Sequence, residues 1–203
     1  RSTLFPYTTL FRSCRKYGWP THERQAYRYF VGNGIPKLVE RLAPADQRTP
    51  AVLEAALADF KRDYGQHLRD TTAPYPGIPE MLAKLKASDV QLAVFSNKAD
   101  ALAKEVVKDY FGTQYFTIVR GQMTGVAPKP AAEGTNALLQ ALHADPASTL
   151  YVGDSNVDVE TAHNANLPCC GAVWGFRTRE ELNAAGAEYL AENSDELYDV
   201  IMK

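Results

Sequence analysis

The sequence of 203 residues predicts an α/β fold in which a doubly wound parallel sheet follows a purely helical segment. From residue 78 onward, helical and strand patterns alternate with short connections, which is typical of a parallel sheet covered by helices on both faces. Between residues 23 and 70, the apolar residues recur only at helical intervals. Apolar residues make up 45% of the chain, which is enough for a sizeable packed core.

The helical segment is expected to contain three helices. Residues 23–31 place apolar side chains at helical spacing, residues 32–34 (Gly-Asn-Gly) interrupt the pattern, and residues 35–43 resume it. A long amphipathic helix is expected over residues 49–68, with Thr49 as its N-cap and a proline in its first turn. A block of helices without strands is consistent with a small bundle or with a lid on another domain.

The alternating segment is assigned from short apolar, β-branched runs, which predict strands, and from amphipathic runs, which predict helices. The last helix has Ser194 as its expected N-cap. The expected helices are 78–89, 98–111, 131–143, 157–166, 178–186 and 194–202, and the expected strands are 90–97, 116–121, 148–155, 168–175 and, with a weaker pattern, 187–193.

Composition excludes several classes of partner. The net charge of −2 argues against nucleic acid or an acidic membrane surface as the main partner. No apolar run approaches the roughly 20 residues that a membrane-spanning helix requires. Cys14, Cys169 and Cys170 form no disulfide framework, and the four histidines show no zinc-ligand spacing. We therefore expect a soluble cytoplasmic protein with no nucleic acid and no membrane as partner.

Polar residues follow two of the expected strands. Ser96 and Asn97 end the first of them, where a hydroxyl, an amide and free backbone N–H groups can hold a phosphate. Taken alone, Ser96 is more simply explained as the cap of the next helix. Lys129 lies between two prolines in a stiff loop, which suits a charge held in place, although a lysine in a loop is by default a surface residue.

Two carboxylates follow the strand at residues 148–155. Asp154 comes after this strand through a glycine, and Asp158 lies in the first turn of the next helix. Carboxylates in this arrangement suit Mg²⁺, which is held by one or two of them together with water and substrate phosphate. Aspartate is also a good residue for the start of a helix, so a purely structural role is a serious alternative.

The order of these residues carries a resemblance. Ser96, then Lys129, then the Gly-Asp-Ser-x-x-x-Asp series that contains Asp154 and Asp158 resembles motifs II, III and IV of the haloacid dehalogenase-like hydrolase superfamily. The helical segment resembles the cap of its subfamily I. The stretches YGWP, VGNG with the following LVERLA, YPGIPEMLAKLK, FSNK, PKP, VGDSNVDVETAHNA and WGFR are similar to those of phosphoglycolate phosphatases, and the likeness runs from about Tyr17 to the C-terminus.

The resemblance implies a cap over residues 14–72 and a Rossmannoid core over residues 73–203. It also implies a Mg²⁺-dependent phosphatase acting through an aspartyl-phosphate on a small phosphorylated metabolite, with 2-phosphoglycolate favoured, as a monomer or homodimer. The implied roles are phosphoryl binding by Ser96 and Asn97, charge neutralisation by Lys129, metal ligation by Asp154 and Asp158, and substrate recognition from the cap by Gly32, Asn33 and Gly34.

The beginning of the chain departs from the family pattern. The family has its first strand there, with an Asp-x-Asp-Gly-Thr motif that supplies the nucleophile and the general acid, whereas no aspartate precedes Asp46 in this chain. Residues 3–13, TLFPYTTLFRS, match the translation of a DNA that resembles a sequencing-library adapter. We interpret residues 1–13 as an artefact joined to a truncated gene. We therefore expect the first central strand to be missing and the chain to be inactive and poorly stable.

Two groups of alternatives remain open. Another family member, such as a sugar phosphatase, a phosphoglucomutase-like enzyme or a haloacid dehalogenase, would share Ser96, Lys129 and Asp154. A non-catalytic domain that binds phosphate or Mg²⁺, or a receiver-like signalling module, would also have acidic strand ends on a doubly wound sheet. The long helical segment before the strands disfavours a receiver module.

Overall fold

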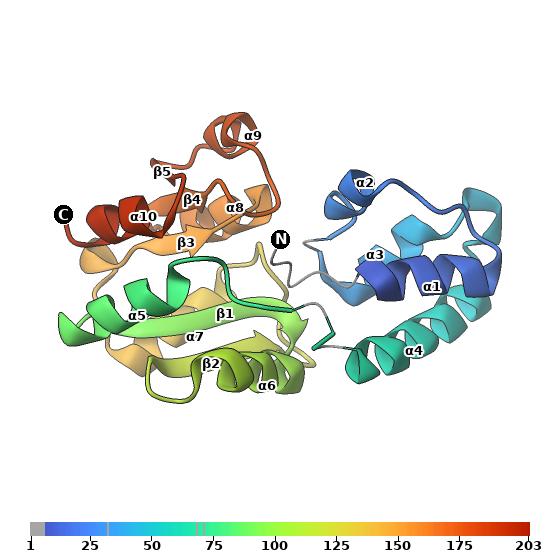
Figure 1. The fold of residues 1–203 in the computed structure, drawn as a ribbon, viewed down its shortest axis with the longest axis horizontal. Helices are drawn as coiled ribbons and strands as arrows, with labels where there is room; N and C mark the ends of the chain where they lie inside the picture. The colour runs from blue at the N-terminus through green and yellow to red at the C-terminus, as the bar shows by residue number, and fades with distance from the viewer. Residues whose placement is uncertain (1–6, 32, 68, 71) are drawn as a thin grey trace. The chain divides into compact units, whose positions relative to one another are not determined.

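The computed structural model describes residues 7–31, 33–67, 69–70 and 72–203, and the chain divides into two compact units (Figure 1). The first unit is Arg1–Tyr75 and the second is Pro76–Lys203. In the described residues, the first unit is helical and the second alternates between helices and strands. None of the described helices is both long enough and apolar enough to cross a membrane.

The described helices of the first unit surround a small apolar core. They are α1 (Tyr7–Tyr17), α2 (Arg24–Arg28), α3 (Gly34–Leu42), the short 3₁₀ helix η1 (Ala45–Gln47) and α4 (Pro50–Gln66). Thr49 caps α4 as predicted, since its side chain accepts a hydrogen bond from the N–H of Val52 at 3.4 Å. α1 and α3 both pack against α4, and Leu10, Leu42 and Phe60 are fully buried.

The helix predicted over residues 23–31 is shorter than expected. α2 ends at Arg28, and the N–H groups of Tyr29 and Phe30 bond three residues back instead of four, which tightens the turn. The rings of Tyr27 and Phe30 pack edge to face with each other and with His22. The helical spacing did not predict this aromatic packing.

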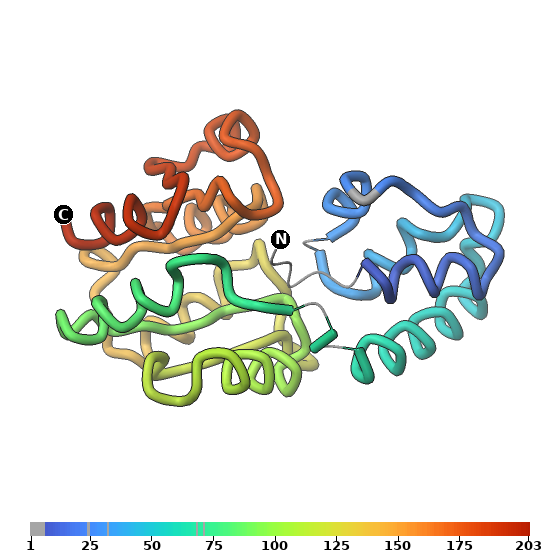
Figure 2. The backbone as a smooth tube through the Cα atoms, viewed as in Figure 1, coloured from blue at the N-terminus to red at the C-terminus, as the bar shows by residue number. Residues whose placement is uncertain are grey.

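The second unit contains five parallel strands in two separate sheets. Figure 2 follows the chain through this unit from the green segment to the red C-terminus. In the described residues, β1 pairs with β2, while β4 lies between β3 and β5. The elements are α5 (Ile78–Ala87), β1 (Leu92–Ala99), α6 (Asp100–Phe111), β2 (Phe116–Gln122), α7 (Glu133–Leu142), η2 (Pro146–Ser148), β3 (Tyr151–Gly153), α8 (Asn156–Asn164), β4 (Cys169–Ala172), α9 (Arg179–Ala184), β5 (Tyr189–Ala191) and α10 (Ser194–Ile201).

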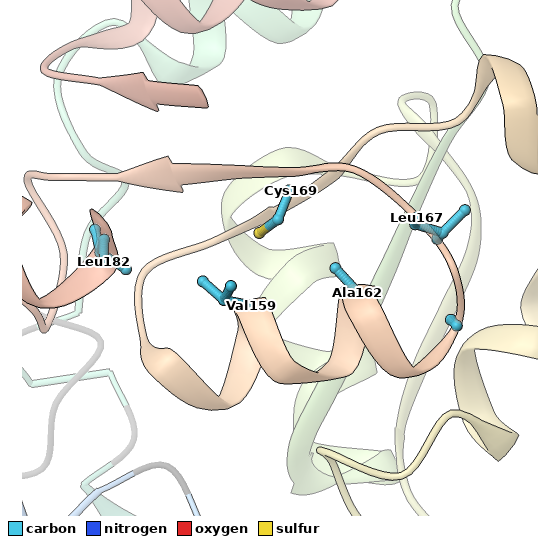
Figure 3. Close-up of a cluster of buried hydrophobic side chains, with 6 residues drawn as sticks. Val159, Ala162, Leu167, Cys169 and Leu182 are labelled. Carbon is cyan, nitrogen blue, oxygen red and sulfur yellow. The ribbon is translucent and has the colours of Figure 1, made fainter. Parts of the chain in front are cut away.

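Cys169 and Cys170 show that helices cover both faces of the three-stranded sheet. Successive side chains of a strand point to opposite faces, and both cysteines are fully buried. Cys169 packs with Val159 of α8 and Leu182 of α9 (Figure 3), whereas Cys170 packs with residues of α5 and α10 such as Leu85. The prediction of a buried strand here is confirmed, and both thiols are free.

Two predicted details are wrong. The strand expected to be buried at residues 90–97 is β1, most of which is only half-buried, with Ala93 exposed. In the described residues it has a partner strand on one edge only. The N-cap of α10 is Asn193 and not Ser194, because the side chain of Asn193 accepts hydrogen bonds from the N–H groups of Asp195 and Glu196.

Candidate active site

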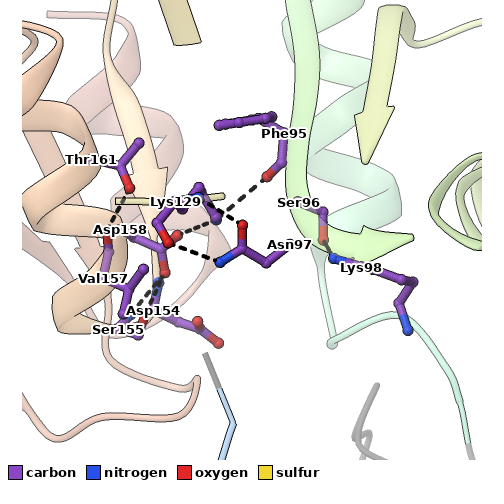
Figure 4. Close-up of polar contacts among 10 residues, drawn as sticks. All are labelled: Phe95, Ser96, Asn97, Lys98, Lys129, Asp154, Ser155, Val157, Asp158 and Thr161. Atoms are coloured by element: carbon purple, nitrogen blue, oxygen red, sulfur yellow. Dashed lines mark hydrogen bonds and ion pairs between the residues drawn. The ribbon is translucent and has the colours of Figure 1, made fainter. Parts of the chain in front are cut away.

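The candidate residues of the second unit come from three neighbouring segments (Figure 4). Ser96 and Asn97 lie in the second half of β1, and Lys129 lies in the loop between β2 and α7. Asp154 directly follows β3, and Asp158 lies in the first turn of α8. The strands are parallel within each sheet, and Lys129 joins the two sets of residues through its hydrogen bond to Asn97 and its ion pair with Asp158. The carboxyl ends of parallel strands are where α/β proteins bind ligands.

The side chain of Asn97 holds the backbone of Lys129. Its Oδ1 accepts a hydrogen bond from the N–H of Lys129 at 2.8 Å, and its Nδ2 donates to the carbonyl oxygen of Lys129 at 3.2 Å. This reciprocal pair connects β1 to the loop that carries the lysine. The backbone of Lys129 is therefore fixed, and the default view of it as a surface lysine is wrong because its side chain is buried.

The ammonium group of Lys129 lies between β1 and β3. Its Nζ is 2.6 Å from Oδ1 of Asp158 and 3.5 Å from the carbonyl oxygen of Phe95. It also lies 5.9 Å from the ring centres of Phe95 and Tyr151, so aromatic faces add to its stabilisation. Burial acts to lower the pKa of Lys129, but the charge of Asp158 outweighs it and holds the pKa above its usual value.

Asp158 is held by protein groups at both of its carboxylate oxygens. Oδ1 receives Lys129, and Oδ2 accepts hydrogen bonds from the hydroxyl of Ser155 at 2.7 Å, from its N–H at 3.1 Å and from the N–H of Asp154 at 3.2 Å. Burial acts to raise its pKa, but Lys129 prevails and the pKa of Asp158 is lowered. The structural role in starting α8 is therefore real, and direct ligation of a metal by Asp158 stays a prediction.

Asp154 has a different electrostatic environment. Burial first, and then the neighbouring charge of Asp158, raises the pKa of Asp154 well above its ordinary value. Its Oδ2 accepts a hydrogen bond from the N–H of Phe176 at 3.2 Å, and its carbonyl oxygen accepts one from the N–H of Arg177 at 3.0 Å. An ionised carboxylate that is buried beside the negative charge of Asp158 would be stabilised by a nearby cation.

The donor set fits Mg²⁺. In the part of the chain that the structure describes, no three His, Cys, Asp or Glu side chains gather into a cation site. Asp154, with Asp158 beside it, supplies hard oxygen atoms, and Mg²⁺ is commonly held by one or two carboxylates while water and substrate complete its shell. Asp154 would be the primary ligand, since the hydrogen bonds to Asp158 occupy both of its oxygens.

Within the described part of the chain, the remaining candidate residues make no hydrogen bond to Lys129, Asp154 or Asp158. The hydroxyl of Ser96 accepts a hydrogen bond from the N–H of Lys98 at 3.1 Å, and no hydrogen bond within the described residues joins it to Lys129 or Asp154. Gly32 lies outside the described residues. Asn33 and Gly34 belong to the first unit, where Oδ1 of Asn33 accepts a hydrogen bond from Arg41 at 2.8 Å. Their role toward a substrate stays a prediction.

Two features near these residues were not predicted from the sequence. Lys98, next to Asn97, has its pKa lowered to about 8 by burial. The turn of residues 175–177, which follows β4, supplies the two N–H groups that bond Asp154. The stretch WGFR supported the family resemblance, but its contact with Asp154 depends on the position of β4 beside β3, which no local pattern specifies.

Comparison with known proteins identifies the family. Residues 4–172 match the family model described as haloacid dehalogenase-like hydrolase. The chain belongs to the haloacid dehalogenase-like hydrolases. The family predicted from the motifs around Ser96, Lys129 and Asp154 is therefore confirmed. By its family, the chain is a phosphatase-like hydrolase.

Curated relatives of this haloacid dehalogenase-like hydrolase include several phosphoglycolate phosphatases. That of Mesorhizobium japonicum is 29% identical to the chain, over 77% of this chain and 70% of the relative. A plasmid phosphoglycolate phosphatase of Cupriavidus necator is 31% identical, over 83% of this chain and 73% of the relative. That of Neisseria meningitidis serogroup A is 32% identical, and the match spans 64% of the relative's length.

Solved structures share the fold of this haloacid dehalogenase-like hydrolase. A protein from Lactobacillus delbrueckii subsp. bulgaricus, with the provisional name phosphoglycolate phosphatase, superposes with a TM-score of 0.90 at 24% identity, over 96% of this chain and 90% of that chain. CbbY from Rhodobacter sphaeroides, in complex with phosphate, gives a TM-score of 0.74 at 20% identity, over 94% and 88%. These likenesses show the α/β fold.

Proposed function

We propose that the chain derives from a Mg²⁺-dependent phosphatase that hydrolyses 2-phosphoglycolate to glycolate and phosphate. Membership of the hydrolase family supports the class of reaction, and the relatives named phosphoglycolate phosphatase support the substrate. The observation that carries the proposal is the position of Lys129, whose ammonium group is fixed between β1 and β3 beside the carboxylate of Asp158. Such a fixed cation can neutralise the charge on a transferring phosphoryl group.

The described residues divide the work in this proposal. Ser96 and the backbone at Asn97 bind the phosphoryl oxygens. The side chain of Asn97 is not assigned to this role, because its amide is already hydrogen-bonded to the backbone of Lys129. Lys129 lowers the charge between the phosphate and its attacking group. Asp154 holds the metal with Asp158 beside it, and bound Mg²⁺ would supply charge neutralisation at the phosphoryl oxygens. In this proposal the first unit is the cap, and the carboxylate end of the substrate is recognised by Gly32, Asn33 and Gly34.

We further propose that the chain as written is inactive. In the intact parent, an aspartate would take the phosphoryl group as an aspartyl-phosphate, and water would then release phosphate. This chain has no aspartate before Asp46, which lies in η1 of the first unit. In the described residues, β1 and β3 each have one edge that pairs with no strand, and the ammonium group of Lys129 lies between them.

A paired assay tests this function. One arm is the chain as it stands, and the second replaces residues 1–13 by a strand, an Asp-x-Asp-Gly-Thr motif and a helix. A third arm is the same replacement with Asn for the first Asp of the motif. Each is assayed for Mg²⁺-dependent phosphate release from 2-phosphoglycolate, hexose phosphates and chloroacetate, the last followed by chloride release. We expect turnover of 2-phosphoglycolate by the second arm alone.

The other outcomes decide between specific alternatives. Turnover by the unmodified chain would mean that another carboxylate acts as nucleophile. Turnover of a different substrate by the repaired chain would replace phosphoglycolate and keep the reaction class. A non-catalytic role in binding phosphate or Mg²⁺ is favoured by one observation, that Asp158 is fully engaged by protein donors. Vanadate binding without turnover in any repaired arm would support that role.

A further inference from the structure

The turn of residues 175–177, between β4 and α9, holds Asp154 at two points. The N–H of Phe176 donates to the carboxylate Oδ2 at 3.2 Å, and the N–H of Arg177 donates to the carbonyl oxygen at 3.0 Å. The turn is itself tied to β4, because the N–H of Gly175 donates to the carbonyl oxygen of Ala172 at 3.1 Å. Backbone N–H groups of the turn therefore connect Asp154 to the neighbouring strand.

Gly175 approaches Asp154 more closely than any other residue type could. A Cβ atom added at position 175 would lie 2.1 Å from Cβ of Asp154 and 2.3 Å from its Oδ2. The backbone of Gly175 does not adopt the left-handed conformation that favours glycine. The position therefore requires glycine for lack of space, and the atoms that take up the space belong to Asp154.

The opposite side of Asp154 is fixed as well. Its N–H donates to Oδ2 of Asp158 at 3.2 Å, and a Cβ added at Gly153 would lie 2.1 Å from Cβ of Asp158. Asp154 is thus held between the start of α8 and the turn of residues 175–177. Within the described residues, the carboxylate accepts its hydrogen bond at Oδ2, so Oδ1 is the oxygen that could bind a cation.

We propose that the turn of residues 175–177 is a positioning element that aims the carboxylate of Asp154 at a divalent cation, with Gly175 as its essential residue. The inference rests on the proposed function, because it takes Asp154 as the metal ligand. Groups that orient a metal ligand commonly change metal affinity by about 10-fold to 100-fold when they are altered. A methyl group at position 175 must displace the carboxylate, so it should act on metal affinity through Asp154.

Binding of Mn²⁺ to the full chain tests the inference, with free Mn²⁺ followed by electron paramagnetic resonance. We expect Gly175→Ala to weaken Mn²⁺ binding by about 10-fold or more. Gly65→Ala is the matched control, because a Cβ at that position meets nothing within 4 Å, and its affinity should equal that of the unmodified chain. Asp154→Asn tests the metal ligand itself and should abolish the site.

The outcomes separate the two claims. Unchanged affinity in Gly175→Ala, with binding lost in Asp154→Asn, overturns the positioning role and leaves the proposed function in place. Absence of saturable binding to the unmodified chain, or full binding by Asp154→Asn, overturns both. If Gly175→Ala does not fold, adding Asp154→Gly should restore folding, since it removes the atoms that the methyl group meets. Failure of that restoration overturns the inference.

Discussion

The ammonium of Lys129 lies 2.6 Å from Oδ1 of Asp158, and the two side chains are only 12% and 9% exposed. The sequence assigned them separate roles, one toward phosphate and one toward a metal. In the structure they form a single buried ion pair that joins the β2–α7 loop to α8. Any change at one of them therefore also affects the other.

Lys129→Met is expected to destabilise the chain by about 3–5 kcal/mol, because it leaves the carboxylate of Asp158 buried without its partner. Urea unfolding at pH 7 measures the change. Lys104→Met is the control, since Lys104 is 57% exposed and pairs with Asp100 on the surface, where a pair contributes at most about 1 kcal/mol. Equal losses in the two variants would contradict the importance of the buried pair.

Asn97→Ala is expected to lower stability by about 1–3 kcal/mol, because the N–H and carbonyl groups of Lys129 lose their partners. Thermal unfolding provides the measurement. Asn97→Asp keeps an oxygen that can accept the 2.8 Å hydrogen bond but sets a carboxylate oxygen against the carbonyl oxygen of Lys129, so it should also be less stable than the unmodified chain. Unchanged stability in either variant would refute this account of the side chain.

Leu10→Ala is expected to cost about 2–5 kcal/mol of stability, because Leu10 of α1 is fully buried in the first unit. Phe11→Ala, the neighbouring change at a side chain that is 44% exposed, should cost much less. Denaturant unfolding compares the two. A small effect of Leu10→Ala would show that residues 7–13 do not pack in solution, whatever the origin of that segment.

The acid side of the stability profile should depend on Asp59. Hydrogen bonds from Lys16 first, and then from Tyr17 at 2.7 Å, lower the pKa of Asp59 to about 2. Because this folded value lies below the unfolded value of about 3.9, the stabilisation is complete above the unfolded pKa and is lost as pH falls toward 2.

Asp59→Asn should therefore lower stability at pH 7, and its difference from the unmodified chain should shrink between about pH 4 and pH 2. Urea unfolding at several pH values follows the difference. Asp46→Asn removes an exposed carboxylate from the same unit and is the control. A difference for Asp59→Asn that stays constant across this range would contradict the assigned cause.

Local sequence patterns predicted the helices and strands of the fold more accurately than they predicted how buried each element is and what it contacts. The Thr49 cap and the buried cysteine strand follow from residue type and period, and both are found. The half-buried state of β1 could not be predicted, because it depends on which strands lie beside it. The early end of α2 after Arg28 and the contacts among the rings of His22, Tyr27 and Phe30 were not predicted, because helical spacing does not encode them.

The sequence predicted the residues of the candidate site, but it did not predict the hydrogen bonds and contacts that join them. Ser96, Lys129 and Asp154 were found from their places after strands, since parallel strands bring their ends together. The sequence did not indicate that Asn97 would bind the backbone of Lys129, or that Gly175 would pack on Asp154. These contacts join segments far apart in the chain, so only the three-dimensional arrangement reveals them.

The separation of the strands into two sheets has a consequence for behaviour at high concentration. In the described residues, β1 and β3 each end a sheet with a row of backbone donors and acceptors that no strand satisfies. Val152 of β3 is also 40% exposed, which adds an apolar side chain to one edge. Open edges of this kind pair readily with a second molecule. The fraction of monomer should therefore fall as the protein concentration rises. A short peptide that blocks these edges should keep the protein monomeric.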